Sequence, residues 1–260
     1  MVAHIRAPLF VPANRPERFA KAAASGADAV ILDLEDAVAA DAKDAARAAL
    51  DAGFTGLPVI VRINAHATPW HAADLVAVSA MPVAAVILPK AEDPHICTAI
   101  ARAAGKPVIA LIESARGLAH AREIAAAEGV SRLAFGSIDY CADLGCAHLR
   151  EVLLPARSEL VLASRLAGIA APIDGVTVTL DDLSVSRDDA AHARAMGMTG
   201  KLCIHPRQIA EVLSAFAPSA AEIDWANRVL TSGDGAVSVD GAMVDEPVRI
   251  RARAILAQAG

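Results

Sequence analysis

Charged and polar side chains recur in this sequence at one kind of position, the end of a short apolar run. The clearest case is PVIALIE, residues 107–113, in which an apolar run leads directly into Glu113. Core strands otherwise avoid ionisable residues, because burying an unpaired charge is very costly. The polar residues that close such runs are Asn14, Arg15, Asp33, Glu35, Asp36, Arg62, Asn64, Lys90, Glu113, Asp139 and His205. A single one of them would be interpreted as a helix cap or a salt bridge, but the set predicts a shared site.

Glu113 and Asp139 close consecutive apolar runs, residues 107–113 and 132–139. If these runs are neighbouring parallel strands, both carboxylates lie at the same edge and can converge on one point. Two hard oxygen ligands suit Mg²⁺, with Mn²⁺ as a substitute, because the ion keeps waters and takes further ligands from a substrate. No His lies close to either residue in sequence, which weighs against zinc and against a two-His, one-carboxylate iron site. The alternative is an acidic pair that a neighbouring cation neutralises.

Four further residues could act beside that pair. Arg62 has a planar fork that suits a substrate carboxylate or a developing enolate oxygen, or else a salt bridge with Glu35 or Asp36. Glu35 and Asp36 are candidate catalytic carboxylates that would hold Lys90, Arg62 or the waters of a metal. Lys90 could form a Schiff base, as in metal-independent aldolases, but its acidic neighbours favour a role in positioning substrate or neutralising acids. Asp33 lies deeper in its run and is expected to be structural.

The apolar runs alternate strictly with Ala-rich helical patterns. The runs span residues 7–13, 29–36, 58–64, 84–90, 107–113, 132–139, 173–178 and 200–206. The helical patterns, with Pro near their start or Gly beyond their end, span 16–26, 39–52, 70–81, 94–104, 115–128, 149–167, 187–196 and 206–216. Eight such units predict an α/β fold, the (β/α)8 TIM barrel, for which about 250 residues is typical. A doubly wound open sheet is the alternative, but no G-x-G-x-x-G turn follows the first run.

The barrel is complete before the last part of the chain. A helix is expected at 220–230 and another at 248–257, and SVDGAMVD between them predicts a hairpin with Asp240-Gly241 at its turn. We therefore expect a catalytic barrel domain over residues 1–217 and a C-terminal extension over 218–260. The extension could cover an active site of its own barrel or reach a neighbouring subunit.

Composition excludes several classes of protein. The net charge is −6 with no Lys/Arg cluster, which disfavours nucleic-acid binding. No stretch of about 18 apolar residues predicts a membrane span, and the N-terminus carries charges too early for a secretory signal. The four cysteines form no C-x-x-C pair and are expected to be reduced in a cytoplasmic protein. A zinc site formed by Cys141, Cys146 and His148 would have poor spacing.

Eight blocks of the chain, in this order, resemble the citrate lyase β-subunit-like family of the HpcH/HpaI aldolase/citrate lyase superfamily. The blocks are LFVPANRPER, VILDLEDAV, VRINAHATPWHAADL, VILPKAE, IALIESARGL, FGSIDYCADLG, GKLCIHPRQI and GAMVDEP. The resemblance covers essentially the whole chain. It implies a (β/α)8 barrel and Mg²⁺-dependent cleavage or formation of a C–C bond between a 2-oxo acid and an acyl-thioester enolate. Malyl-, citramalyl- and citryl-CoA are substrates of this kind.

The same blocks imply roles for individual residues. Glu113 and Asp139 match the family's metal ligands, and Arg62 and Glu113 match its substrate contacts. Asp245 matches an aspartate that in CoA-using relatives reaches a neighbouring subunit's site, and it is the candidate for proton transfer at the acetyl carbon. Relatives that work on an acyl carrier protein often lack the tail. Its presence favours a free CoA thioester and a homotrimer.

Other residues are expected on the thioester side of the site. Asn14, Arg15 and the turn at 204–206 are the candidates, and Arg15 would bind a CoA phosphate or pair with Glu17 at the surface. His205 is expected to be structural. Two alternative functions stay open, an aldolase acting on free 2-oxo acids and a non-catalytic barrel that binds a metabolite. Thioester hydrolysis after condensation is a further outcome that the sequence allows.

Overall fold

The computed structural model describes residues 2–233, 235 and 237–259. The chain forms two compact units, one ending at Leu213 and one beginning at Ser214, and each is described by itself. Within the described residues, no helix has both the length and the apolar character needed to cross a membrane.

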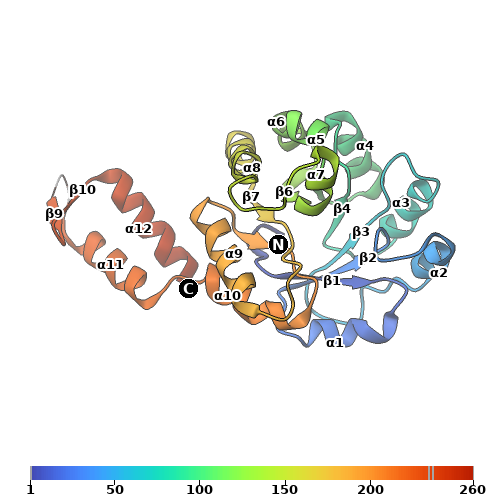
Figure 1. The fold of residues 1–260 in the computed structure, drawn as a ribbon, viewed down its shortest axis with the longest axis horizontal. Coiled ribbons are helices and arrows are strands. Elements are labelled where there is room, and N and C mark those ends of the chain that lie inside the picture. Colours follow the sequence, from blue (N-terminus) through green and yellow to red (C-terminus); the bar gives the residue numbers. More distant parts are fainter. Residues whose placement is uncertain (1, 234, 236, 260) are drawn as a thin grey trace. The chain divides into compact units, whose positions relative to one another are not determined.

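The first unit is a barrel of eight parallel strands (Figure 1). The strands are β1 Pro8–Pro12, β2 Ala29–Asp33, β3 Val59–Arg62, β4 Ala85–Leu88, β5 Val108–Ile112, β6 Val130–Phe135, β7 Ala170–Asp174 and β8 Gly200–Lys201. They pair in chain order, each parallel to the next. A parallel bridge joins Leu9 to Cys203, and the amide of Phe10 donates to the carbonyl of Cys203 at 2.9 Å. The predicted (β/α)8 barrel is therefore confirmed.

Helices surround the strands (Figure 1). They are α1 Phe19–Ala23, α2 Lys43–Ala48, α3 His71–Ser79, α4 Pro94–Ala104, α5 Ala115–Ala119, α6 Ala121–Ala126, α7 Ser137–Leu144, α8 Leu154–Ala167, α9 Leu183–Ala195 and α10 Ile209–Phe216. Short 3-10 helices lie at Val2–His4, Pro16–Arg18, Ala40–Ala42 and Pro206–Gln208. Sequence signals set the ends of α4, because the Asp93 side chain accepts the amide of His95 and Gly105 ends the helix with a φ of 61°.

Branched aliphatic side chains fill the barrel. Ile31, Ile60, Ile87 and Ile109, from four consecutive strands, belong to one buried cluster. Because this cluster covers one face of each strand and helices cover the other, the strands are nearly continuous apolar runs. Polar side chains are therefore concentrated in the loops that follow the strands.

The sixth run departs from the prediction. β6 ends at Phe135, and the buried residues Ser137, Tyr140 and Cys141 then follow the spacing of a helix, which is α7. Asp139 lies in the first turn of α7, so the expectation that it closes a strand is wrong. Its proximity to the barrel mouth comes from the helix that begins directly after β6.

The last two strands also differ from their predicted spans. β7 covers 170–174 rather than 173–178, and β8 has only two residues instead of 200–206. Gly175 follows β7 in a crowded turn, where a Cβ would lie 2.3 Å from Ser137 Oγ. His205 accepts the amide of Arg207 and caps the 3-10 helix that follows β8.

Several helices differ from their predicted spans, and three of them do so for clear local reasons. The helix predicted over 115–128 divides at His120, whose φ of −103° and ψ of 12° break it into α5 and α6. The helix predicted from 149 begins at Leu154, where a Pro occupies the first turn. α9 begins four residues earlier than predicted because Asp182 caps it by accepting the amide of Ser184.

The second unit contains a helix, a hairpin and a helix. The elements are α11 Ala220–Thr231, β9 Val237–Val239, β10 Ala242–Val244 and α12 Glu246–Ala259. Asp240 and Gly241 at the hairpin turn have φ angles of 53° and 79°, as a type I′ turn requires. Buried side chains of α11, β10 and α12 form a core of their own. The predicted order of elements in this part of the chain is therefore confirmed.

Candidate active site

Glu113 follows β5 directly and is only 3% exposed. Its Oε1 atom accepts the backbone amide of Lys90 at 2.7 Å. Lys90 has a φ of 48°, a left-handed conformation that is strained for a residue other than glycine. The helix after β5 is capped by Ser114, whose Oγ accepts the amide of Gly117 at 3.0 Å. The Glu113 carboxylate is therefore not a helix cap, which was the alternative to a functional role.

The environment of Glu113 disfavours its negative charge. Burial raises its pKa most, and the charges of Glu35 and Asp139 add to this effect. The amide and the cationic side chain of Lys90 act in the opposite direction but do not compensate, so the pKa of Glu113 is about 8. A cation placed against Glu113 would reverse this shift.

Glycine residues leave room for the carboxylates. Gly136 lies between β6 and α7, and a Cβ built there would lie 2.4 Å from both Cβ and Oε2 of Glu113. Asp139 is in the same segment, in the first turn of α7. The close approach of the Gly136 backbone is therefore what allows the α7 segment to reach Glu113.

Gly136→Ala is expected to displace the Glu113 carboxylate. A displacement of about 1 Å in an active site lowers turnover by about 10²-fold, and we expect an effect of that size. Turnover can be compared with that of Gly56→Ala, because a Cβ at Gly56 meets nothing within 4 Å. Equal turnover in the two variants, with both folded by circular dichroism, would contradict this role of Gly136.

Arg62 is the last residue of β3 and is held from two sides. Its Nε and Nη2 atoms donate to the two oxygens of Asp33, each at 2.7 Å, and its Nη1 lies 3.0 Å from Glu35 Oε2. The guanidinium also stacks over the Phe10 ring, 4.8 Å from the ring centroid. Asp33 is therefore the residue that orients Arg62, whereas Glu35 or Asp36 was the salt-bridge partner expected from the sequence. Asp36 is more distant, 3.7 Å from Nη1, and its side chain is largely exposed.

Lys90 and Glu35 form an ion pair at the same edge. Lys90 Nζ lies 3.1 Å from Glu35 Oε1. Burial alone would lower the pKa of Lys90, but the charge and hydrogen bond of Glu35 outweigh burial and raise it. A Schiff-base lysine needs a lowered pKa, so this environment opposes that alternative. Burial raises the pKa of Glu35, although Arg62 and Lys90 partly offset the effect.

Lys43, on α2, is a site residue that sequence reasoning missed. It is 6% exposed, and its Nζ donates to the carbonyls of Leu34 and Glu35, both at 2.7 Å. The ammonium also lies 5.3 Å from the centroid of the Trp70 ring. Lys43 thereby fixes the turn after β2 that carries Glu35. Its position within an Ala-rich helix gave no signal of this role.

The predicted thioester-side residues lie after β1. Asn14 is half-buried, and its Oδ1 atom is buried without a hydrogen-bond partner among the described residues. Arg15 is exposed and pairs with Glu17 at 2.6 Å, which is the surface alternative foreseen for it. His205 makes the structural bond expected of it, as the cap after β8. Asp245 lies in the second unit, where it accepts the amide of Val248 at 3.3 Å.

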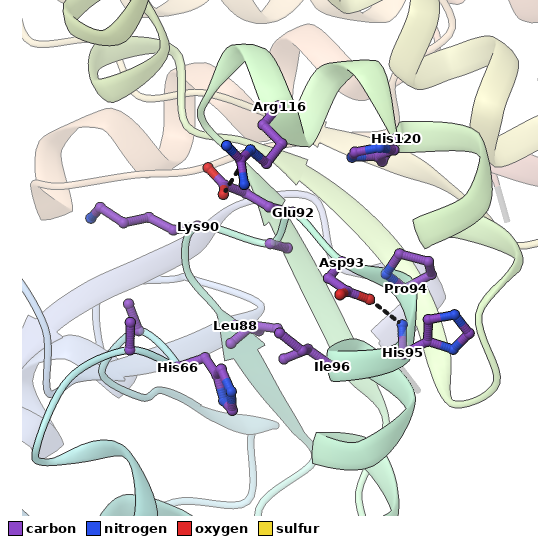
Figure 2. Close-up of a pocket in the computed structure, with 13 residues that line it drawn as sticks. His66, Leu88, Lys90, Glu92, Asp93, Pro94, His95, Ile96, Arg116 and His120 are labelled. Carbon is purple, nitrogen blue, oxygen red and sulfur yellow. Dashed lines mark hydrogen bonds and ion pairs between the residues drawn. The ribbon is translucent and has the colours of Figure 1, made fainter.

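A pocket of about 630 Å³ opens beside Lys90, between the loops after β3 and β4 and helix α5 (Figure 2). Arg116 and His120 lie along the α5 side, and Asp93 and His95 lie at the start of α4. Lys90 borders the pocket and also holds Glu113 through its amide. The pocket therefore adjoins the candidate site at Lys90.

The charges around Glu113 fit a hard divalent cation. The carboxylates that interact there include Asp33, Glu35, Asp36, Glu113 and Asp139, and the cations include Lys43, Arg62 and Lys90. Carboxylates outnumber cations in this set, and a bound divalent cation would offset the excess negative charge. The described residues contain no group of three or more His, Cys, Asp and Glu side chains placed for a metal. Two carboxylates would leave the other positions of Mg²⁺ to substrate and water.

Comparison with known proteins identifies the family. The model of the HpcH/HpaI aldolase/citrate lyase family matches residues 6–206. A citrate lyase subunit beta-like protein of Mycobacterium tuberculosis is 42% identical, over 97% of this chain and 94% of the relative. A (3S)-malyl-CoA thioesterase of Cereibacter sphaeroides is 34% identical, over 98% of this chain and 94% of the relative.

A solved structure gives the same result. The crystal structure of protein CitE from Mycobacterium tuberculosis, in complex with magnesium, acetoacetate and coenzyme A, matches with a TM-score of 0.90 and 40% identity. The match covers 100% of both chains. The chain therefore belongs to the HpcH/HpaI aldolase/citrate lyase family of carbon–carbon lyases.

Proposed function

We propose that this chain is a Mg²⁺-dependent lyase that cleaves, or forms, a 3-hydroxyacyl-CoA such as malyl-, citramalyl- or citryl-CoA. The products of cleavage are a 2-oxo acid and acetyl-CoA. The observation that carries the proposal is the Glu113 carboxylate, which is buried close to Glu35 and Asp139; burial first, and then these two charges, raise its pKa to about 8. The magnesium, acetoacetate and coenzyme A bound to CitE of Mycobacterium tuberculosis agree with it.

Glu113 and Asp139 are the residues that would hold the metal. When bound, Mg²⁺ supplies a Lewis acid and a template for the carboxylate and neighbouring oxygen of the substrate. Arg62 presents the guanidinium hydrogens that Asp33 leaves free, and these offset the charge that develops on the substrate oxygen. Glu35 accepts the hydroxyl proton, because burial raises its pKa and Lys43 and Lys90 fix its position. The C–C bond then breaks and the thioester enolate leaves.

The enolate needs a proton at its carbon to become acetyl-CoA. Asp245 is our candidate for this transfer, contributed by the same chain or by a neighbour in a homotrimer. We expect Asp245→Asn to lower turnover by about 10²–10⁴-fold, the usual range for a lost general acid or base. Mixing Asp245→Asn chains with Glu113→Gln chains should restore turnover if Asp245 acts in a neighbouring subunit. Full turnover by Asp245→Asn would show that Asp245 does not transfer this proton.

Lys90 is assigned to positioning rather than to covalent catalysis. Treatment of the protein with pyruvate or oxaloacetate and sodium borohydride is therefore expected to leave the mass of the Lys90 peptide unchanged. The reason is the ion pair with Glu35, which keeps the amine protonated. A borohydride-stable adduct on Lys90, detected by mass spectrometry, would favour a metal-independent aldolase instead.

The test of the function is turnover of malyl-, citramalyl- and citryl-CoA in the presence of Mg²⁺. Release of acetyl-CoA together with a 2-oxo acid is the expected result. Release of free CoA together with the uncleaved hydroxy acid would instead identify a thioesterase. A thioesterase is the second candidate function, because the Cereibacter sphaeroides relative is a (3S)-malyl-CoA thioesterase. A lack of turnover on all three thioesters would contradict both functions.

A further inference from the structure

The end of helix α7 brings two cysteines together. Gly145 follows the helix with a φ of 67°, and the amide of Cys146 donates to the carbonyl of Cys141 at 3.1 Å. This bond and the left-handed glycine define a Schellman motif, in which the side chain after the glycine packs against the one five residues earlier. In most helices that contact joins two apolar side chains. In α7 it joins two thiols.

The two cysteines differ in exposure. Both are free, and Cys141 is 7% exposed while Cys146 is half-buried. The Cys141 and Cys146 side chains lie within hydrogen-bonding reach of one another. Cys97 and Cys203 are fully buried and lie on α4 and after β8. An oxidant in solution can therefore reach Cys146 first, with Cys141 already in place beside it.

We propose that Cys141 and Cys146 are a redox-active pair that forms an intramolecular disulfide on exposure to a small-molecule disulfide such as oxidised glutathione. The Cys146 thiolate attacks one glutathione sulfur, the S–S bond breaks, and one glutathione leaves and takes up a proton. The Cys141 sulfur then loses its proton and attacks the sulfur of Cys146, which expels the second glutathione. Two electrons and two protons pass from the cysteine pair to one glutathione disulfide.

The pair lies next to the candidate metal site. Asp139 is in the first turn of α7, and the loop after Cys146 returns to that turn through a 2.9 Å hydrogen bond between His148 and Ser137. A disulfide at the far end of α7 would join the helix to this loop covalently. The proposal concerns the chemistry of the pair and does not depend on the proposed reaction or on the metal.

Both cysteines fall on one tryptic peptide, Leu133–Arg150, so the experiment is direct. The folded protein is incubated with oxidised glutathione, and its remaining thiols are alkylated under denaturing conditions. The protein is then digested with trypsin, and the mass of the peptide is measured by mass spectrometry. We expect a peptide that lacks two hydrogens, carries no alkyl group and regains both thiols on reduction. Cys141→Ser should instead accumulate glutathione on Cys146, because the second attack is lost. Cys97→Ser is the matched control and should form the disulfide as the unsubstituted protein does.

The unsubstituted protein decides the outcome without relying on the folding of any variant. Alkylation of both cysteines after oxidation would show that the pair is inert and would overturn the proposal. Glutathione that remains on Cys146 of the unsubstituted protein would also overturn it, because Cys141 would then fail to resolve the mixed disulfide.

Discussion

Glu113→Gln is expected to abolish magnesium-dependent turnover while leaving the barrel folded. The amide keeps the shape of the side chain but removes the charge that would hold the metal. Loss of metal-ion stabilisation costs several kcal/mol of transition-state energy, so kcat/KM should fall by roughly 10³-fold or more. The exposed Glu128, paired with Arg102, provides the control, and Glu128→Gln should keep full turnover. Retention of more than about a tenth of turnover by Glu113→Gln would exclude Glu113 as a metal ligand.

The same substitution should change the pH dependence of stability in the metal-free protein. The pKa of Glu113 is raised from 4.5 to about 8, so the folded state holds a proton that the unfolded chain releases. Stability therefore falls as pH rises between these two values, because the unfolded state binds fewer protons there. Glu113→Gln should remove this contribution and be the more stable protein at pH 8 in EDTA. Urea titrations at several pH values measure the difference, and parallel curves for the two proteins would contradict the raised pKa.

Among the substitutions proposed for this chain, Asp174→Asn is expected to lower the free energy of unfolding most. Asp174 is fully buried at the end of β7, with Arg157 Nε at 2.8 Å and Lys201 Nζ at 3.2 Å from its carboxylate. Removing its charge would leave two buried cations without their counterion. Breaking such a buried pair typically costs about 3–5 kcal/mol. The free energy of unfolding from urea titration is the measurement.

The control for Asp174→Asn is Asp181→Asn, because Asp181 is exposed in the following loop. Arg157 and Lys201 hold the pKa of Asp174 below its ordinary value, although burial alone would raise it. The stabilisation is therefore present above the unfolded pKa of about 3.9 and is lost as pH falls through the lower, folded pKa. The difference in the free energy of unfolding between the variant and the unsubstituted protein should accordingly be largest at pH 7 and should decrease only in strong acid. A loss of less than 1 kcal/mol at pH 7 would show that the buried cations find other partners.

Regular patterns in the sequence predicted most of the barrel. The runs that became β2 and β5 are continuous and apolar, and each ends at a charged residue, so both the strands and their ends were predictable. The run at 132–139 misled because Leu133, Ala134 and Phe135 belong to a strand while Ser137 already belongs to a helix. One glycine separates the two, and a periodicity is hard to recognise over so few residues.

The site was predictable where strand ends carry its residues. Glu113, Arg62 and Glu35 were identified because a charge after an apolar run is unusual. Lys43 and Gly136 were missed, since a helical lysine and a glycine between two elements have many ordinary roles. Their functions depend on close contacts, of Lys43 with the turn after β2 and of Gly136 with the end of the adjacent strand, that sequence spacing does not reveal. The orientation of Arg62 by Asp33 became definite only with the bidentate geometry in hand.

The central claim is that a divalent cation held by Glu113 and Asp139 makes this chain a carbon–carbon lyase. The most direct test is to strip the protein with EDTA and titrate Mg²⁺ back while following release of the 2-oxo acid from the best thioester. Turnover should be absent after chelation, return with a saturable dependence on Mg²⁺, and fail to return in Asp139→Asn. Undiminished C–C cleavage in EDTA, or an unchanged Mg²⁺ dependence in Asp139→Asn, would contradict the claim.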